Sequence, residues 1–242
     1  MTDFMLMFLL SVTIFVTHFI GALTGFGCTV LALPFTISLI GIEFGKPVLI
    51  VLGFVQCLVV AIEQFKDINW NEVKKVVSYV AIGMPIGLIC YKFLPKEMLI
   101  TCLSVFMLLV SIKGLLELKG YEFKTPKNIV LNFLLFLGGI IHGAFVSGGP
   151  LLMIYSTEKI KNKDTFRATM CIIWVILNAF LMVDGLISGV YTSEVFNYIL
   201  ISLPALFIGI WLANKLTCKV NQRMFNYIIY IVLGTTAIFN FI

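Results

Sequence analysis

The chain has 242 residues, of which 60% are hydrophobic and only 12% are charged, and its formal net charge is +5. Soluble domains average roughly 45–50% apolar and about 25% charged residues, so this composition excludes a soluble globular protein and predicts an all-α polytopic membrane protein. We interpret the positive charge as lysine-rich loops and expect no nucleic-acid partner; the lipid bilayer is the expected surrounding.

Residues 4–42 form an apolar stretch that is too long for one crossing, because about 20 helical residues span the hydrocarbon core. The run GALTGFGCTVLALP (21–34) interrupts this stretch, and it predicts a break followed by a short helix to about Ile40. The residues at this break are Gly25, Phe26, Gly27, Cys28 and Thr29. Broken backbone at membrane depth is tolerated only inside protein or around a polar cavity, so we expect the break to face the protein interior.

Residues 128–157 repeat the pattern, since a continuous helix over this range would be about 45 Å long, too long for one crossing and too short for two. We predict a helix to about Val146, a non-helical turn, and a short helix opened by proline with serine as its N-cap. The residues at this second break are Ser147, Gly148, Gly149 and Pro150.

Six other segments have the length and apolar character of ordinary crossing helices: 46–63, 74–93, 97–116, 168–188, 195–214 and 223–242. Gly21 and Gly25 recur as Gly139 and Gly143 half a chain later, which is typical of an internal repeat. The two repeats are predicted as 1–121 and 122–242 in one membrane domain. If each broken, re-entrant-like pair returns to its own side, each half adds three transmembrane helices and the second repeat is inverted.

Lysine and arginine positions predict the orientation. With the N-terminus outside, the inside loops carry 14 of the 17 basic residues, as the positive-inside rule requires. These loops are 64–75, 113–127, 158–167 and 215–223. We therefore expect both termini outside a cell membrane.

The two breaks are candidate anion sites. Free N–H groups and the positive dipole end of a half-helix attract an anion without a full charge in the membrane. The alternative is that the glycines only permit close helix packing. Arg167 begins a crossing helix, where its guanidinium either binds an oxyanion through two donors or anchors an inside loop beside Lys161 and Lys163.

Several other polar residues have two interpretations each. His142 is either a proton relay or substrate donor or a packing residue, and His18 is treated in the same way. Gln56 and Asn178 bind either another helix or a substrate oxygen. Asp184 and Glu63 either reach water or couple protons, which makes protons a candidate coupling ion. The six cysteines lack a CxxC pair, and we interpret them as core packing rather than disulfides or a redox relay.

At these residues the chain resembles the sulfite exporter TauE/SafE family. The glycine-rich break and proline of that family look like 21–34, and its second pattern looks like SGGPLLMIYSTEKIKNKDTFRAT (147–169). Cys28 and Thr29 depart from the further glycine that is common there. The resemblance implies export, with uptake as the alternative, of a small sulfur-containing or organic anion such as sulfite, a sulfonate or thiosulfate, driven by the proton gradient.

The sequence thus predicts a secondary transporter that works by alternating access, with an anion channel of the same architecture as the alternative. An enzyme is not expected, because HExxH, GxSxG and CxxC patterns are missing, and ATP-driven transport would need a partner because GxxxxGK[ST] is missing. We predict no catalytic residues, no metal site and no cofactor, and no pattern predicts an oligomeric state.

Overall fold

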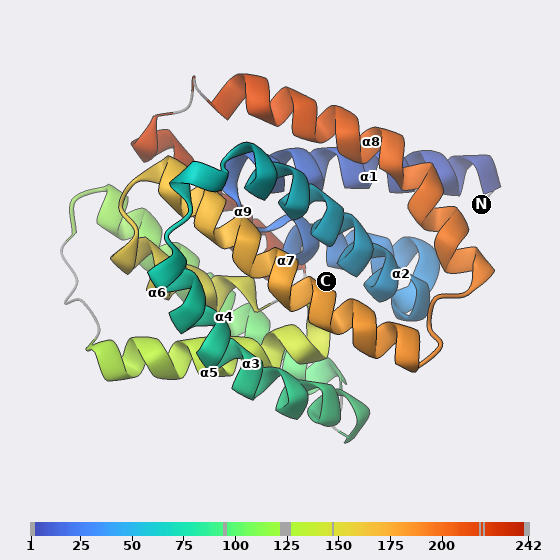
Figure 1. The fold of residues 1–242 in the computed structure, drawn as a ribbon, viewed down its shortest axis with the longest axis horizontal. Coiled ribbons are helices and arrows are strands. Elements are labelled where there is room, and N and C mark those ends of the chain that lie inside the picture. The colour runs from blue at the N-terminus through green and yellow to red at the C-terminus, as the bar shows by residue number, and fades with distance from the viewer. Residues whose placement is uncertain are drawn as a thin grey trace. The chain divides into compact units, whose positions relative to one another are not determined.

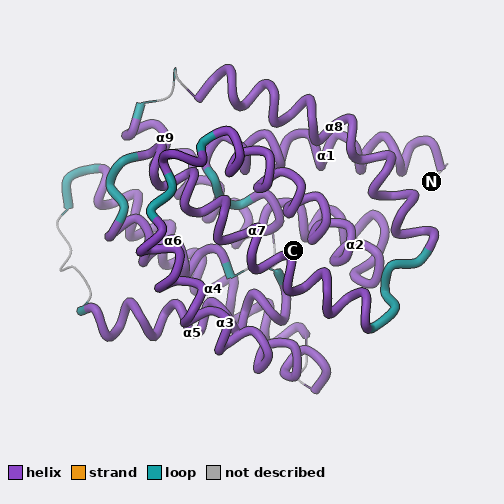
Figure 2. The backbone as a smooth tube through the Cα atoms, in the orientation of Figure 1, coloured by secondary structure: helices purple, strands orange, loops and turns teal. Residues whose placement is uncertain are grey.

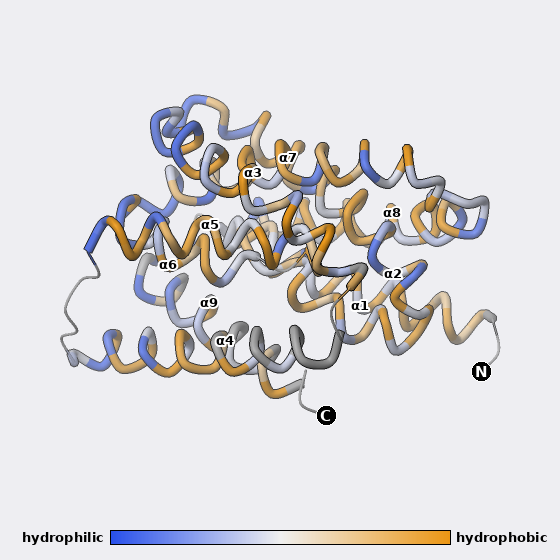
Figure 3. Tube along the Cα trace, turned by 90° about the horizontal axis from the view of Figure 1, so that it is seen from below, coloured by the Kyte–Doolittle hydropathy of each residue, from blue (hydrophilic) through white to orange (hydrophobic). Residues whose placement is uncertain are grey.

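The computed structural model describes residues 3–93, 96–121, 127–146, 148–217, 219 and 221–239. Throughout these residues the regular elements are helices, and no strand occurs among them (Figure 2). Six of the described helices are long and apolar enough to cross a membrane. Hydrophobic residues run along the helices, and hydrophilic ones gather toward the loops (Figure 3). The protein is an all-α polytopic membrane protein, as the composition predicts.

The helices follow the predicted segments closely. They are α1 (Asp3–Thr24), α2 (Cys28–Glu63), α3 (Trp70–Phe93), α4 (Lys96–Leu118), α5 (Asn128–Phe145), α6 (Gly149–Lys159), α7 (Lys163–Ile187), α8 (Ser193–Thr217) and α9 (Gln222–Phe239), with a short 3₁₀ helix at Phe65–Asp67. The predicted end of the last crossing helix, 240–242, lies outside the described residues.

The first predicted break is confirmed. The helix α1 ends at Thr24 and α2 begins at Cys28, and between them Gly25 and Gly27 have φ angles of +74° and +90°, the left-handed region that favours glycine. The backbone of α2 is non-helical at Gly41, where φ is +77°. This kink divides α2 into a short first segment and a crossing second segment, so the predicted end near Ile40 is confirmed as well.

The second predicted break is also confirmed, with one correction. The helix α5 ends at Phe145, and Val146 caps it with a left-handed φ of +59°. Ser147 lies outside the described residues, and the N-cap of α6 is Gly148 rather than the predicted serine. Gly149 is already helical, and Pro150 lies in the first turn as expected. Only glycine fits at the cap, because a Cβ on Gly148 would lie 2.7 Å from the Cβ of His142.

The chain forms two compact units that each draw helices from both sequence halves. Unit 1 comprises Met1–Ile68 and Arg167–Lys219, and unit 2 comprises Asn69–Phe166 and Val220–Ile242. In unit 1, α1 packs against α8 and α2, and α2 packs against α8 (Figure 1). In unit 2, α5 packs against α3 and α6, and α4 packs against α9. In the predicted repeats α5 corresponds to α1 and α3 to α8, so the same pairing occurs in both units.

Glycines allow the backbones of these paired helices to approach each other closely. In unit 2, a Cβ on Gly83 of α3 would lie 2.9 Å from the backbone nitrogen of Ile140 on α5, and Gly87 of α3 also faces the backbone of Ile140. In unit 1, a Cβ on Gly209 of α8 would lie 3.2 Å from the carbonyl oxygen of Phe15 on α1. Gly87 and Gly209 are 122 residues apart in the sequence, about the length of one predicted repeat. Small residues thus serve close helix packing at equivalent contacts of the two units.

Candidate functional site

Within unit 1, one face of α7 packs against the first break. Arg167, Cys171, Trp174 and Asn178 follow each other at spacings of four, three and four residues, which places them on one side of the helix. All four are buried, with exposed fractions of 3%, 0%, 8% and 3%. The face therefore forms a continuous polar and sulfur-bearing wall against the end of α1 and the start of α2.

Arg167 fastens the end of α1. Its Nε donates a hydrogen bond of 2.5 Å to the carbonyl oxygen of Ala22, one of the last carbonyls of the helix, which lack an intrahelical partner. The N–H of Phe26 would serve this carbonyl in a continuous helix, but it donates instead to Oγ1 of Thr24 at 3.3 Å. The guanidinium therefore supplies the donor that the break removes.

The same guanidinium is tied to a carboxylate through an amide. Nη2 of Arg167 donates to Oδ1 of Asn214 at 2.5 Å, and Nδ2 of Asn214 donates to Oε2 of Glu63 at 2.6 Å. Asn214 lies on α8 and Glu63 ends α2, so the chain of bonds joins α1, α2, α7 and α8. A buried cation needs such partners, because an unpaired charge inside a protein is costly.

Trp174 holds the break from the same side. Its Nε1 donates to the carbonyl oxygen of Gly25 at 3.2 Å. A Cβ on Gly25 would lie 2.8 Å from Cα of Arg167, so the backbones of the break and of α7 are in direct contact. Gly25 is therefore required twice, by its positive φ and by this close approach.

Gln56 and Asn178 both lie near the first break. With its amide oriented to pair both groups, Gln56 donates to the carbonyl oxygen of His18 at 3.2 Å and accepts from the N–H of Ala22 at 3.0 Å. Asn178 is separated from Thr29 only by Gly53, whose Cβ would lie 3.4 Å from Nδ2 of Asn178 and 3.2 Å from Cγ2 of Thr29. Both amides thus lie close to the first turn of α2.

The side chains of two further candidates take no part in these bonds. Nδ1 of His18 is 3.1 Å from the carbonyl oxygen of Ile14, and the ring is fully buried in α1. Asp184 is half-buried on α7 but lies off the face that contacts the break, because its spacing from Asn178 turns it to another side of the helix.

The second break lies in unit 2, where α6 is anchored to α3. Gly148, Gly149, Pro150 and His142 are buried there. Along α6 the hydroxyl of Tyr155 donates to Oε2 of Glu72 at 2.6 Å. The glycine N-cap offers no side chain to the first turn of α6, as at the start of α2.

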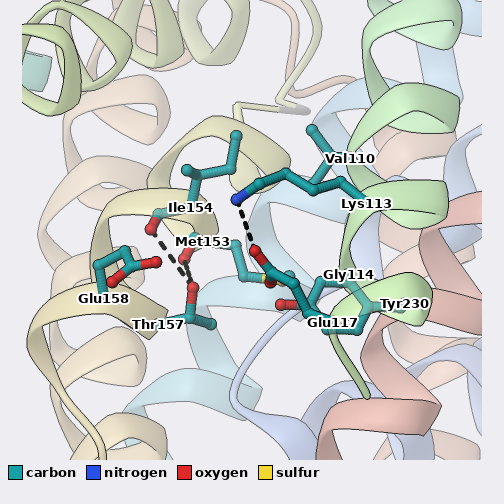
Figure 4. Close-up of a pocket in the computed structure, with 9 residues that line it drawn as sticks. All are labelled: Val110, Lys113, Gly114, Glu117, Met153, Ile154, Thr157, Glu158 and Tyr230. Atoms are coloured by element: carbon teal, nitrogen blue, oxygen red, sulfur yellow. Dashed lines mark hydrogen bonds and ion pairs between the residues drawn. The ribbon is translucent and has the colours of Figure 1, made fainter. Parts of the chain in front are cut away.

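A separate pocket of about 40 Å³ opens in unit 2 among α4, α6 and α9 (Figure 4). Lys113 and Glu117, one turn apart on α4, form an ion pair of 2.9 Å in its wall, and Thr157, Glu158 and Tyr230 complete its polar lining. None of the predicted site residues lines this pocket. Within the described part of the chain, no group of three or more His, Cys, Asp or Glu residues is placed to hold a metal ion.

The sulfite exporter TauE/SafE family model matches residues 10–240. The chain belongs to this family. No curated protein and no solved structure matches it. Family membership confirms the resemblance seen in the sequence and identifies the protein as a membrane transporter of sulfur-containing anions of the sulfite type.

Within this TauE/SafE protein, the run FRAT (166–169) thus supplies Arg167 at the first break rather than at the second, which precedes it in the chain. Sequence reasoning missed the role of Trp174 and the bridge through Asn214. The spacing of Arg167, Cys171, Trp174 and Asn178 along one helical face was the available signal.

Proposed function

We propose that this protein is a secondary transporter that exports a small sulfur-containing anion by alternating access, with the start of α2 as part of its substrate site. The observation that carries the proposal is a helix N-terminus buried at a glycine break. Phe26 and Cys28 are 2% and 7% exposed, and Gly27 at the N-cap has no side chain to offer the first-turn N–H groups. Such groups, with the positive dipole end, bind an anion without a formal charge.

The second break has the same features within unit 2, and we propose that it binds substrate in the same way. Gly148 is the N-cap of α6, and Gly149 and Pro150 open a buried helix. We assign substrate contact to the backbone of Gly25–Thr29 and of 148–150; the predicted site residue Ser147 lies outside the described residues. Arg167 contributes positive charge beside Gly25 and holds the carbonyl of Ala22 away from the substrate.

The two-repeat organisation supports alternating access. The pairs α1–α8 and α5–α3 are equivalent contacts in the two units, and both have a glycine at the close approach. We therefore retain 1–121 and 122–242 as two inverted repeats in a cell membrane, with both termini outside. Rocking of one repeat against the other would expose the site to each side in turn.

Protons are the proposed coupling ion, and three side chains are candidates for carrying them. Glu63 is exposed and connects through Asn214 to Arg167. Its protonation would therefore alter the hydrogen bonds of Arg167 at the first break. Asp184 is half-buried on α7, and His142 is buried beside Gly148. We propose Glu63 first, because a chain of hydrogen bonds joins it to the break.

Counterflow tests the proposal. Purified protein in liposomes loaded with unlabelled sulfite or taurine should transiently accumulate the labelled anion above its outside concentration, since exchange through one site couples the two fluxes. A channel of the same architecture would equilibrate the label without overshoot. Absence of any flux of sulfite, sulfonates and thiosulfate, from protein that remains folded, would refute anion transport itself.

A further inference from the structure

Side chains from three helix ends meet at one end of unit 1. Glu63 is the last residue of α2, Asn214 lies near the end of α8, and Arg167 lies near the start of α7. The hydrogen bonds from Arg167 to Asn214, at 2.5 Å, and from Asn214 to Glu63, at 2.6 Å, join these three residues, here called the Asn214 bridge. The bridge therefore ties together three helices where α2 and α8 finish.

Exposure falls along the bridge from its outer end to its inner end. Glu63 is exposed and Asn214 is half-buried, whereas Arg167 is only 3% exposed. The first break lies directly behind Arg167, because a Cβ on Gly25 would be 2.8 Å from Cα of Arg167, and Phe26 in the break is 2% exposed. The bridge thus lies between the buried break and the surroundings at this end of unit 1.

The amide of Asn214 couples the two ends of the bridge. A guanidinium has only donors and a carboxylate has only acceptors, so the amide must turn Oδ1 to Arg167 and Nδ2 to Glu63. If Glu63 releases Nδ2, the amide can rotate, and its oxygen is then no longer held against Nη2 of Arg167. Loss of the outer bond therefore loosens the inner one.

The outer bond is the one that can open most easily. Water reaches the exposed carboxylate of Glu63 and can replace the amide as its donor, so the net stability of this bond is small. The bonds at the break, from Arg167 to the carbonyl oxygen of Ala22 and from Trp174 to that of Gly25, are buried, and their loss would leave buried acceptors unpaired. Opening of the bridge is therefore expected to begin at Glu63.

We propose that the Asn214 bridge is a gate, which closes the first break at the end of unit 1 where α2 and α8 finish. The gate must open for the substrate to reach the start of α2 from that side, as alternating access requires. Asn214 is a positioning residue, because it holds Arg167 over the break without touching the substrate. This inference rests on the proposed function, because it concerns access to the same site.

Alkylation of Cys28 measures whether the gate is open. Cys28 is a free thiol in the first turn of α2 and is 7% exposed, so it should react slowly with N-ethylmaleimide while the gate is closed. The rate is measured by mass spectrometry on the purified full-length protein. It should rise at least about fivefold in Glu63→Ala and in Asn214→Leu, because a lost hydrogen bond to a charged group shifts a local opening equilibrium by about this factor or more. Glu63→Gln should lie between wild type and Glu63→Ala, because it keeps an acceptor for Nδ2 but loses the charge.

Cys90 is the internal control, and Asp67→Ala is the matched variant. Cys90 is half-buried in α3 of unit 2, and Asp67 is an exposed carboxylate shortly after α2 that takes no part in the bridge. The rate at Cys90 should be the same in every variant, and Asp67→Ala should keep the wild-type rate at Cys28. An unchanged rate at Cys28 in Glu63→Ala would overturn the gate, whether or not Asn214→Leu folds. Equal acceleration at Cys28 and Cys90 would overturn it as well, because the bridge would then only stabilise the fold.

Failure of the gate can be distinguished from failure of the proposed function. Normal anion counterflow by the wild-type protein, together with an unchanged rate at Cys28 in the bridge variants, would remove this inference alone. Absence of anion counterflow by the folded wild-type protein would remove the proposed function, whatever the alkylation rates.

Discussion

Arg167→Lys tests how the first break is held. The guanidinium places two donors, Nε and Nη2, each 2.5 Å from an acceptor, and these acceptors belong to Ala22 on α1 and Asn214 on α8. One ammonium nitrogen cannot occupy both positions, although lysine keeps the charge. A buried acceptor that loses its donor costs about 1–3 kcal/mol, so the variant should unfold at lower temperature in detergent and transport should fall severely at a normal membrane level.

Arg223→Lys provides the control. Arg223 is exposed on α9, where its Nη2 donates a long bond of 3.4 Å to the carbonyl oxygen of Leu118. Thermal unfolding monitored by intrinsic fluorescence and anion counterflow should both be close to wild type in this variant. If Arg167→Lys matched Arg223→Lys in both assays, Arg167 would be a loop anchor and the bonds to Ala22 and Asn214 would be dispensable.

The remaining predictions concern the first break, α6 and the topology. Gly25→Ala should abolish counterflow and lower thermal stability, whereas Gly189→Ala should retain counterflow, because both glycines have positive φ but only Gly25 faces the backbone of α7. Tyr155→Phe should cost about 1.5–3 kcal/mol in thermal unfolding through its lost bond to Glu72, and wild-type stability would refute this. Lys119→Cys, in a background without native cysteines, should resist an impermeant thiol reagent in intact cells; labelling from outside would contradict the inverted topology.

The helix breaks could be predicted because the bilayer limits helix length. A helix in an apolar run of 30 or more residues must bend or stop, and glycine and proline show where. Gly25–Gly27 and Pro150 were therefore sufficient to locate the two breaks. The N-cap of α6 was harder, because serine is the better cap in isolation. At this turn the close approach of the backbone to His142 decides the choice, and only the fold reveals that Gly148 must lie there.

Contacts between distant segments could not be predicted from periodicity. Asn214 and Glu63 look like ordinary residues near helix ends, and only the packing of α7 and α8 beside α2 joins them to Arg167. The spacing of Arg167, Cys171, Trp174 and Asn178 did define one face of a helix, but hydrophobic residues surround it and hide its polar character.

The bonds of Arg167 add a third role to the two that the sequence suggested. If the guanidinium only bound substrate, its replacement would raise KM with little effect on stability. One that only anchored a loop would affect neither. Because its Nε serves the orphan carbonyl of Ala22, we expect Arg167→Lys to lower kcat and thermal stability together, while KM changes less. A rise in KM at unchanged stability would instead assign Arg167 to direct substrate contact.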